Sequence, residues 1–301
     1  MDVRFWILIL GLGLMCGWAG QDAGWAAQFH NRQEHALAYK AQQDLEKGKP
    51  RECVHRISPY LAKEETPAAT LFVLCARAQR ELGRTREALS TYARAAGLYP
   101  QNALVLRNYA QTCLDLDRLS EAAEILERVF ALEKDPKLLY QAGAAWYQAG
   151  RFQKAVLVLQ RLLGTTQDRP EEWITLLTYS LVQDKQWEQA ETLMHGLLQK
   201  KPQAAHLWRL LAHVRLEQDD LLGGASALYV AYSLNPPLPK KWQDLASLYA
   251  SARVPLMAVQ VLQGHKGDKL SAALCWQMGQ LYAQALRLKS ALDWMDRALA
   301  Q

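Results

Sequence analysis

Two histidines, His206 and His213, have the spacing that most invites a chemical explanation. Residues seven apart lie on one face of a helix, but two turns from each other. A zinc ion needs three or four ligands that all lie about 2 Å from it. No cysteine or carboxylate converges on this pair by its spacing, so we interpret both histidines as surface residues and predict neither metal nor cofactor.

Searches for catalytic motifs are equally negative. The sequence contains no phosphate-binding glycine loop, no HExxH zinc motif and no GxSxG nucleophile turn. The paired carboxylates Glu171–Glu172 and Asp219–Asp220 fall at expected helix starts or turns, where they suit the positive end of a helix dipole. We therefore predict no catalytic residue and no enzyme activity. The alternative from another functional class is an envelope enzyme or enzyme accessory whose site has no recognisable motif.

Composition excludes several other classes. Of 301 residues, 50% are hydrophobic and 22% are charged, which is typical of a folded chain. The net charge of +5 is spread along the sequence without a block of five basic residues, whereas nucleic-acid binding favours a concentrated basic stripe. We predict no nucleic-acid partner.

The amino terminus has the pattern of a secretory signal, which we assign to residues 1–26 together with a short leader. One arginine precedes an uncharged run from Phe5 to Gly20, and Gly17 and Ala19 are spaced as a cleavage site requires. The run is shorter than the roughly 20 apolar residues of a membrane-spanning helix. The pattern predicts export, with the periplasm as the destination. Retention as a membrane anchor through residues 5–20 and lipidation at Cys16 are the alternatives.

The elements that must carry any site are repeats. Small residues recur at separations of 33 to 35 in one series: Cys53, Ala88, Ala122, Ala155, Ala190, Gly224, Ala258 and Ala291. A second, mostly small series lies twelve residues ahead of it: Ala41, Ala76, Ala110, Gly143, Thr178, Ala212, Ala246 and Gly279. Such a period is typical of stacked two-helix units.

Each unit is predicted to hold two amphipathic helices joined by a short turn, marked by glycine at Gly48, Gly83 and Gly150. Antiparallel helices approach closely only where no bulky side chain intervenes, which explains the small residues. Cys53, Cys75, Cys113 and Cys275 all fall at helix-packing positions of this register. We therefore interpret them as structural thiols and predict no disulfide from their spacing.

This register resembles the tetratricopeptide repeat, and the resemblance extends from about Glu34 to the end. The matching positions are Gly143 and Gly279, Trp208 and Trp242, Tyr249 and Tyr282, with Trp146 in a tyrosine position. The resemblance implies an all-α solenoid of about eight helix-turn-helix repeats, wound into a right-handed superhelix over residues 27–301. The first unit departs from the family pattern at Lys40 and Cys53.

The resemblance also implies where a partner binds. In this family, peptides and proteins usually lie along the concave wall formed by the first helix of each unit. Carrying the wall positions across gives these candidate partner-binding residues: Arg77, Arg80, Arg107, Gln111, Tyr140, Tyr147, Tyr179, Arg209 and His213. Gln243, Ser247, Trp276 and Gln280 occupy the same positions in the last two units. Arginine and tyrosine dominate binding hot spots, so we expect a protein or peptide partner with acidic or carboxylate groups.

These inferences favour a non-enzymatic scaffold that mediates protein–protein interactions in the bacterial cell envelope. The segments EEWITLLTYSLVQDKQWEQAETLM and LPKKWQDLASLYASARVPLMAVQVLQ also resemble repeat proteins that accompany TonB-type energy-transducing systems. An accessory role in such a system, or in outer-membrane or exopolysaccharide export, is therefore an alternative. The oligomeric state is not predicted. We expect a membrane contact only through an uncleaved amino-terminal segment.

Overall fold

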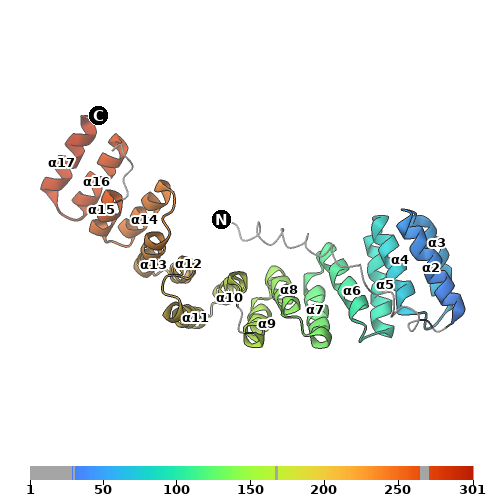
Figure 1. Ribbon diagram of the computed structural model, residues 1–301. Coiled ribbons are helices and arrows are strands. Elements are labelled where there is room, and N and C mark those ends of the chain that lie inside the picture. Colours follow the sequence, from blue (N-terminus) through green and yellow to red (C-terminus); the bar gives the residue numbers. More distant parts are fainter. Residues whose placement is uncertain (1–28, 30, 167–168, 265–270, 301) are drawn as a thin grey trace. The chain divides into compact units, whose positions relative to one another are not determined.

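The computed structural model describes residues 29, 31–166, 169–264 and 271–300, and the predicted signal peptide at residues 1–26 lies outside them. The described residues form sixteen α-helices and no strand (Figure 1). The helices are α2 (Arg32–Glu46), α3 (Pro50–Lys63), α4 (Ala69–Glu81), α5 (Thr85–Leu98), α6 (Ala103–Asp115), α7 (Leu119–Glu133), α8 (Pro136–Gln148), α9 (Phe152–Thr165), α10 (Glu171–Gln183), α11 (Trp187–Lys200), α12 (Ala205–Glu217), α13 (Leu221–Leu234), α14 (Pro239–Ser251), α15 (Pro255–Gly264), α16 (Ala272–Gln284) and α17 (Leu288–Leu299). The predicted all-α solenoid of eight helix pairs is confirmed.

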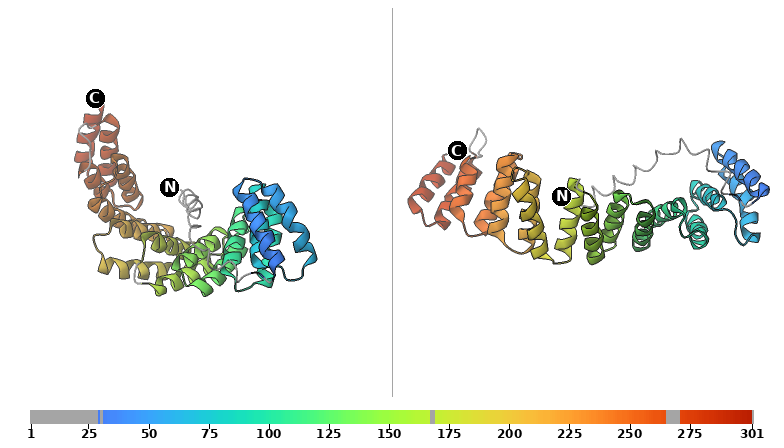
Figure 2. Two further views of the ribbon diagram at one scale, coloured as in Figure 1. Left: turned by 45° about the vertical axis from the view of Figure 1, so that its right-hand side comes forward. Right: turned by 60° about the horizontal axis from the view of Figure 1, so that its bottom comes forward.

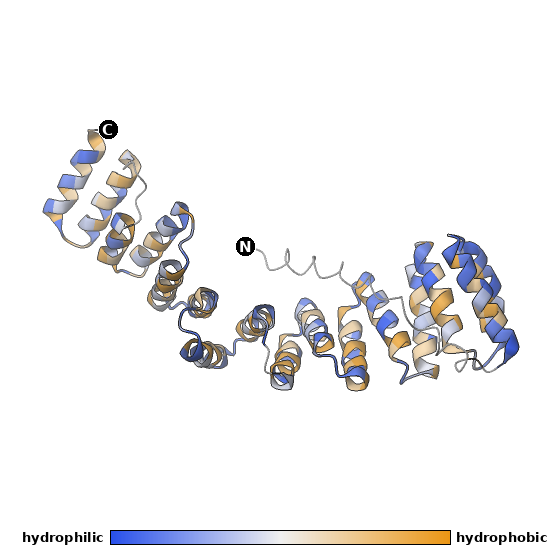
Figure 3. Cartoon of the chain, viewed as in Figure 1, coloured by the Kyte–Doolittle hydropathy of each residue, from blue (hydrophilic) through white to orange (hydrophobic). Residues whose placement is uncertain are grey.

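The helices belong to two compact units, Met1–Leu177 and Thr178–Gln301, with the boundary inside α10. In the first unit each helix from α2 to α9 packs against the next one along the chain, as two views show (Figure 2). The same holds from α11 to α17 in the second unit. Most helices carry apolar residues on one side and polar residues on the other (Figure 3), so stacking buries a continuous apolar layer within each unit. The right-handed superhelix remains a prediction.

The helix crossings occur at the small residues that the period identifies. All sixteen members of the two series are buried. A Cβ atom built on Gly143 of α8 would lie 2.6 Å from Cδ2 of Leu159 on α9. One on Gly279 of α16 would lie 2.7 Å from Cγ of Met295 on α17. At these two crossings a side chain of the partner helix occupies the space that a Cβ atom would need.

The turn inside each helix pair has the same backbone conformation in all eight copies. One residue per turn adopts the left-handed conformation, with φ between 56° and 74°. Glycine occupies three of these positions, and the other five hold Asp117, Lys185, Asp219, Arg253 and Leu286. The next amide then donates to a carbonyl five residues back, as from Arg84 to Gln79. This pattern is the Schellman motif, which satisfies carbonyls at the end of the first helix.

Arginines on the second helices of the first unit join neighbouring pairs. Arg94 of α5 donates to the carbonyls of Leu61 and Glu64 at the end of α3. Arg128 of α7 donates to the carbonyl of Pro100, which follows α5. A cation at the carboxyl end of a helix also interacts favourably with the helix dipole. These contacts fix the spacing of successive pairs from outside the apolar layer.

Cys53, Cys75, Cys113 and Cys275 are all buried, as expected for cysteines at helix-packing positions. Burial raises the pKa of Cys53 and of Cys113 to about 12, which makes both thiols poor nucleophiles.

None of the described helices has the length and apolar character needed to cross a membrane.

The crossing at Gly143 gives a stability test. Leu159 is fully buried and would have to repack to admit a methyl group, so Gly143→Ala should lower the free energy of unfolding by about 1–3 kcal/mol through overpacking. Gly164→Ala on α9 is the matched control, because a Cβ there meets no atom within 4 Å. The control should be neutral or gain up to about 1 kcal/mol from helix propensity. Urea unfolding followed by circular dichroism measures both, and equal effects would contradict the close crossing.

Candidate functional site

The nine candidate residues lie on the first helices of five successive pairs, α4, α6, α8, α10 and α12, and none of them is buried. The first unit contains Arg77, Arg80, Arg107, Gln111, Tyr140 and Tyr147, and the second contains Tyr179, Arg209 and His213. In the first unit, α4 contacts both α2 and α6, so first helices line one side of the stack.

The arginines of the first unit already hold carboxylates of the chain. Arg80 of α4 donates from Nη2 to Oδ2 of Asp115 on α6 over 2.6 Å. Gln111 donates from Nε2 to the other oxygen of Asp115 over 2.9 Å. Asp115 therefore connects two neighbouring first helices, and both charges of the ion pair are about two-thirds shielded from solvent.

Arg107 and Arg77 are paired as well. Arg107 forms a bidentate ion pair with Glu133 at the end of α7. Nε of Arg107 lies 2.9 Å from Oε1 of Glu133, and Nη2 pairs with Oε2. This contact raises the pKa of Arg107 above its ordinary value. Arg77 lies 3.2 Å from Glu81, one turn along α4. The face consequently presents ion pairs of both signs, rather than the purely basic surface that the arginines suggested.

Two tyrosines of the first unit rest on other aromatic rings. Tyr140 of α8 stacks on Trp173 at the start of α10, with ring centroids 6.2 Å apart and an interplanar angle of 24°. Tyr147 packs against Phe152, the first residue of α9, at 5.4 Å. Burial raises the pKa of Tyr140. Both rings are half-buried and held by packing, so they lose little conformational freedom on binding a partner.

The second unit brings Tyr179 of α10 and His213 of α12 together, with ring centroids 4.8 Å apart. Nδ1 of His213 lies 3.9 Å from Oε1 of Glu217, while Nε2 is buried without a hydrogen-bond partner among the described residues. Desolvation lowers the pKa of His213 and outweighs the opposing influence of Glu217. Arg209 is exposed one turn before His213 on the same helix.

The residues that support this face were not predicted from the sequence. Asp115 follows Gln111 by one helical turn and Arg80 by one repeat, so both spacings could have indicated it. Glu133 and Trp173 carry no such mark, because their contacts depend on how adjacent helices pack. Among the described residues, no three histidine, cysteine or carboxylate side chains group as metal ligands would, and His206 and His213 share only their helix.

Helix pairs joined by identical turns define a helical-repeat protein. Residues 79–142, which span the end of α4 to the middle of α8, match the family model described as tetratricopeptide repeat. Residues 79–142 thus match the tetratricopeptide repeat, and a two-helix unit of the same kind recurs through the other described pairs. A search among curated proteins finds no match.

Solved structures with similar folds include several repeat proteins. A chain from the structure of Naa15/Naa10 bound to HypK-THB is 14% identical, with a TM-score of 0.59; the match covers 87% of this chain and 39% of that one. MamA from Desulfovibrio magneticus is 26% identical over 54% of this chain and 92% of its own, with a TM-score of 0.43. YrrB, described as a TPR protein with an unusual peptide-binding site, is 14% identical over 65% of this chain and 97% of its own, with a TM-score of 0.44.

The His213 environment predicts a pH dependence. Since the folded-state pKa is lowered, the unfolded chain binds the proton more readily, and stability falls as the pH drops through the ordinary value of 6.5 toward the folded pKa. His213→Phe keeps an aromatic ring beside Tyr179 and removes this titration. The free energy of unfolding should therefore fall less in the variant than in the wild type between about pH 7 and about pH 5. An equal fall in both proteins would contradict the desolvated environment.

Proposed function

We propose that the protein is a non-enzymatic scaffold of the bacterial cell envelope that binds a protein or peptide on the faces that the first helices form in each unit. The observation that carries this proposal is the recurrence, within each unit, of half-buried aromatic side chains together with arginines at repeat spacing. Tyr140 on Trp173, and Tyr179 on His213, are held in place before any partner arrives. Pre-positioned aromatic rings of this kind are typical binding hot spots.

The ion pairs refine the proposed partner. A carboxylate of the partner would compete with Asp115 for Arg80 and with Glu133 for Arg107. Alternatively, it would accept a hydrogen bond from the same guanidinium group beside the carboxylate that is already bound. Arg209, exposed in the second unit, offers a further contact. We therefore propose that the partner is an extended segment whose acidic groups contact the arginines and whose apolar side chains contact the tyrosines. No contact among the described residues favours the TonB-type, export-machinery or enzyme alternatives over this function.

A photo-cross-linking amino acid at position 107 or 179, used in cells, should capture the same partner protein. With that partner identified, Tyr140→Ala should weaken its binding by on the order of thirtyfold, the cost of truncating a strong hot spot. Arg77→Glu combined with Arg107→Glu should abolish capture while helical content is unchanged. Tyr39→Ala is the matched control, because Tyr39 is 59% exposed on α2 and is not a candidate binding residue. Binding unaffected by the Tyr140 and arginine variants would contradict the proposed face.

The envelope location rests on the amino-terminal pattern, and we propose it together with the scaffold. An alkaline phosphatase reporter, which needs an oxidising compartment to become active, should be active when fused after the first thirty residues. Replacing Leu8 and Leu10 by arginine should abolish that activity, because charges interrupt the apolar run. Activity that survives the two arginines, or a fusion found in the cytosol, would contradict export.

A further inference from the structure

The last described helix, α17, exposes a row of apolar side chains. Leu288, Leu292 and Leu299 are 67%, 62% and 79% exposed, and Met295 lies half-buried between them. The spacings of four, three and four residues place all four on one face of the helix. Only Ala291 is buried on α17. A contiguous apolar surface of this kind marks an interaction site more often than scattered single residues do.

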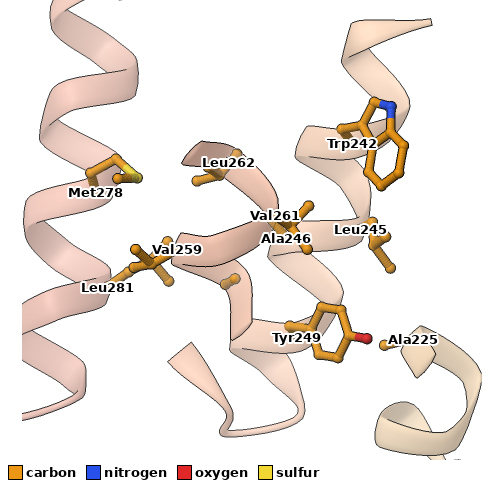
Figure 4. Close-up of a cluster of buried hydrophobic side chains, with 11 residues drawn as sticks. Ala225, Trp242, Leu245, Ala246, Tyr249, Val259, Val261, Leu262, Met278 and Leu281 are labelled. Carbon is orange, nitrogen blue, oxygen red and sulfur yellow. The ribbon is translucent and has the colours of Figure 1, made fainter. Parts of the chain in front are cut away.

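Earlier repeats show what covers this face. One repeat back, Val259 and Leu262 of α15 occupy the positions of Leu292 and Met295, and each is only 3% exposed. They lie in one cluster with Met278 and Leu281 of the following first helix, α16 (Figure 4). Another repeat back, Ala225 of α13 lies at the same position near Tyr249 of α14 and is fully buried. The exposed positions on α17 are therefore equivalent to positions that a following first helix covers in the two earlier repeats.

Two of the first helices that fill this role in the second unit share a simple pattern. Apolar residues stand at positions i, i+4 and i+7 in Leu207, Leu211 and Val214 of α12 and in Leu274, Met278 and Leu281 of α16. All three residues of α12 are buried. In α14 the first of these positions holds the exposed Lys241, whereas Leu245 and Leu248 keep the other two apolar. Apolar residues at i+4 and i+7 are therefore common to all three helices, and an occupant of α17 is expected to carry them.

A second copy of the chain lacks that pattern at its amino-terminal end. The corresponding residues of α2 are Ala36, Lys40 and Gln43, and none of them is buried. Docking α2 on α17 would desolvate the Lys40 ammonium against leucines, which is costly without a partner charge. Head-to-tail stacking of copies is thus disfavoured by the residues themselves.

We propose that the exposed face of α17 docks an amphipathic α-helix of a partner protein, with apolar side chains at positions i+4 and i+7. The site continues the established stacking interface between pairs, and it is distinct from the first-helix face on which the proposed function rests. The docked helix takes the place that α16 takes on α15.

The test uses the full chain and a peptide whose surface is already known to stack in this way. The probe is a fluorescently labelled peptide of residues 204–218, which includes Leu207, Leu211 and Val214, stapled into a helix on its opposite side to remove the cost of helix formation. Fluorescence anisotropy should show saturable binding to the wild-type protein. Leu292→Asp should weaken it at least tenfold. Leu157→Asp is the matched control, because Leu157 on α9 is also 62% exposed, and it should leave binding unchanged.

A probe peptide with Leu211→Asp should fail to bind, and circular dichroism should show that the protein variants keep their helical content. Three results would overturn the proposal. They are an absence of saturable binding, equal binding to the wild type and to Leu292→Asp, and a dimer in sedimentation experiments that excludes the peptide and disappears with Leu292→Asp. The last result would assign the face to a second copy.

Discussion

The fold depends on the close crossing of two helices at residues that have almost no side chain. At Gly143 and Gly279 a side chain of the partner helix lies so near that an added methyl group would overlap it unless that side chain moved. The approach lets leucine and methionine side chains from one helix fill the space over the backbone of the other. Dense contact of this kind, repeated along the chain, supplies the dispersion and burial that each pair lacks on its own. The spacing of the small residues therefore sets the repeat period, and the repeat period sets how successive helix pairs stack.

Because the helices cross at small residues, the outward-facing side chains of the first helices are not part of the helix crossings. In the first unit these positions hold arginines that bind Asp115, Glu133 and Glu81, together with tyrosines that lean on neighbouring aromatic rings. Each ion pair of this exposure adds little to stability, about 0–1 kcal/mol. The ion pairs hold these long side chains at defined places along the face, as the proposed binding of a partner requires.

The sequence predicts the repeat well because steric demands leave a mark on composition. Close crossings require small residues at every copy, so their spacing reveals the helix pairs and explains the buried cysteines. The left-handed turn is less visible. Glycine marks it at Gly83 and Gly150, but Leu286 and Lys185 adopt it too, since a single left-handed residue costs only about 1–2 kcal/mol and the turn satisfies helix-end carbonyls.

The partners of the candidate residues were harder to predict. Asp115 shares an i, i+4 spacing with Gln111, yet its bond to Arg80 depends on how two repeats stack. The stacking of Tyr140 on Trp173 has the same origin, in packing between helices that the period alone does not specify. The division into two compact units inside α10 was not predicted either, because the spacing of small residues continues through that helix unchanged.

The most direct test of the central claim is a pair of nuclear Overhauser effects in the folded protein. We expect a strong cross-peak between a δ-methyl of Leu159 and the α-protons of Gly143, and another between a δ-methyl of Leu216 and the α-protons of Gly224. A Cβ atom built on either glycine lies 2.6 Å from Cδ2 of its leucine. Assigned resonances without either cross-peak would show that the helices do not cross closely at the small residues.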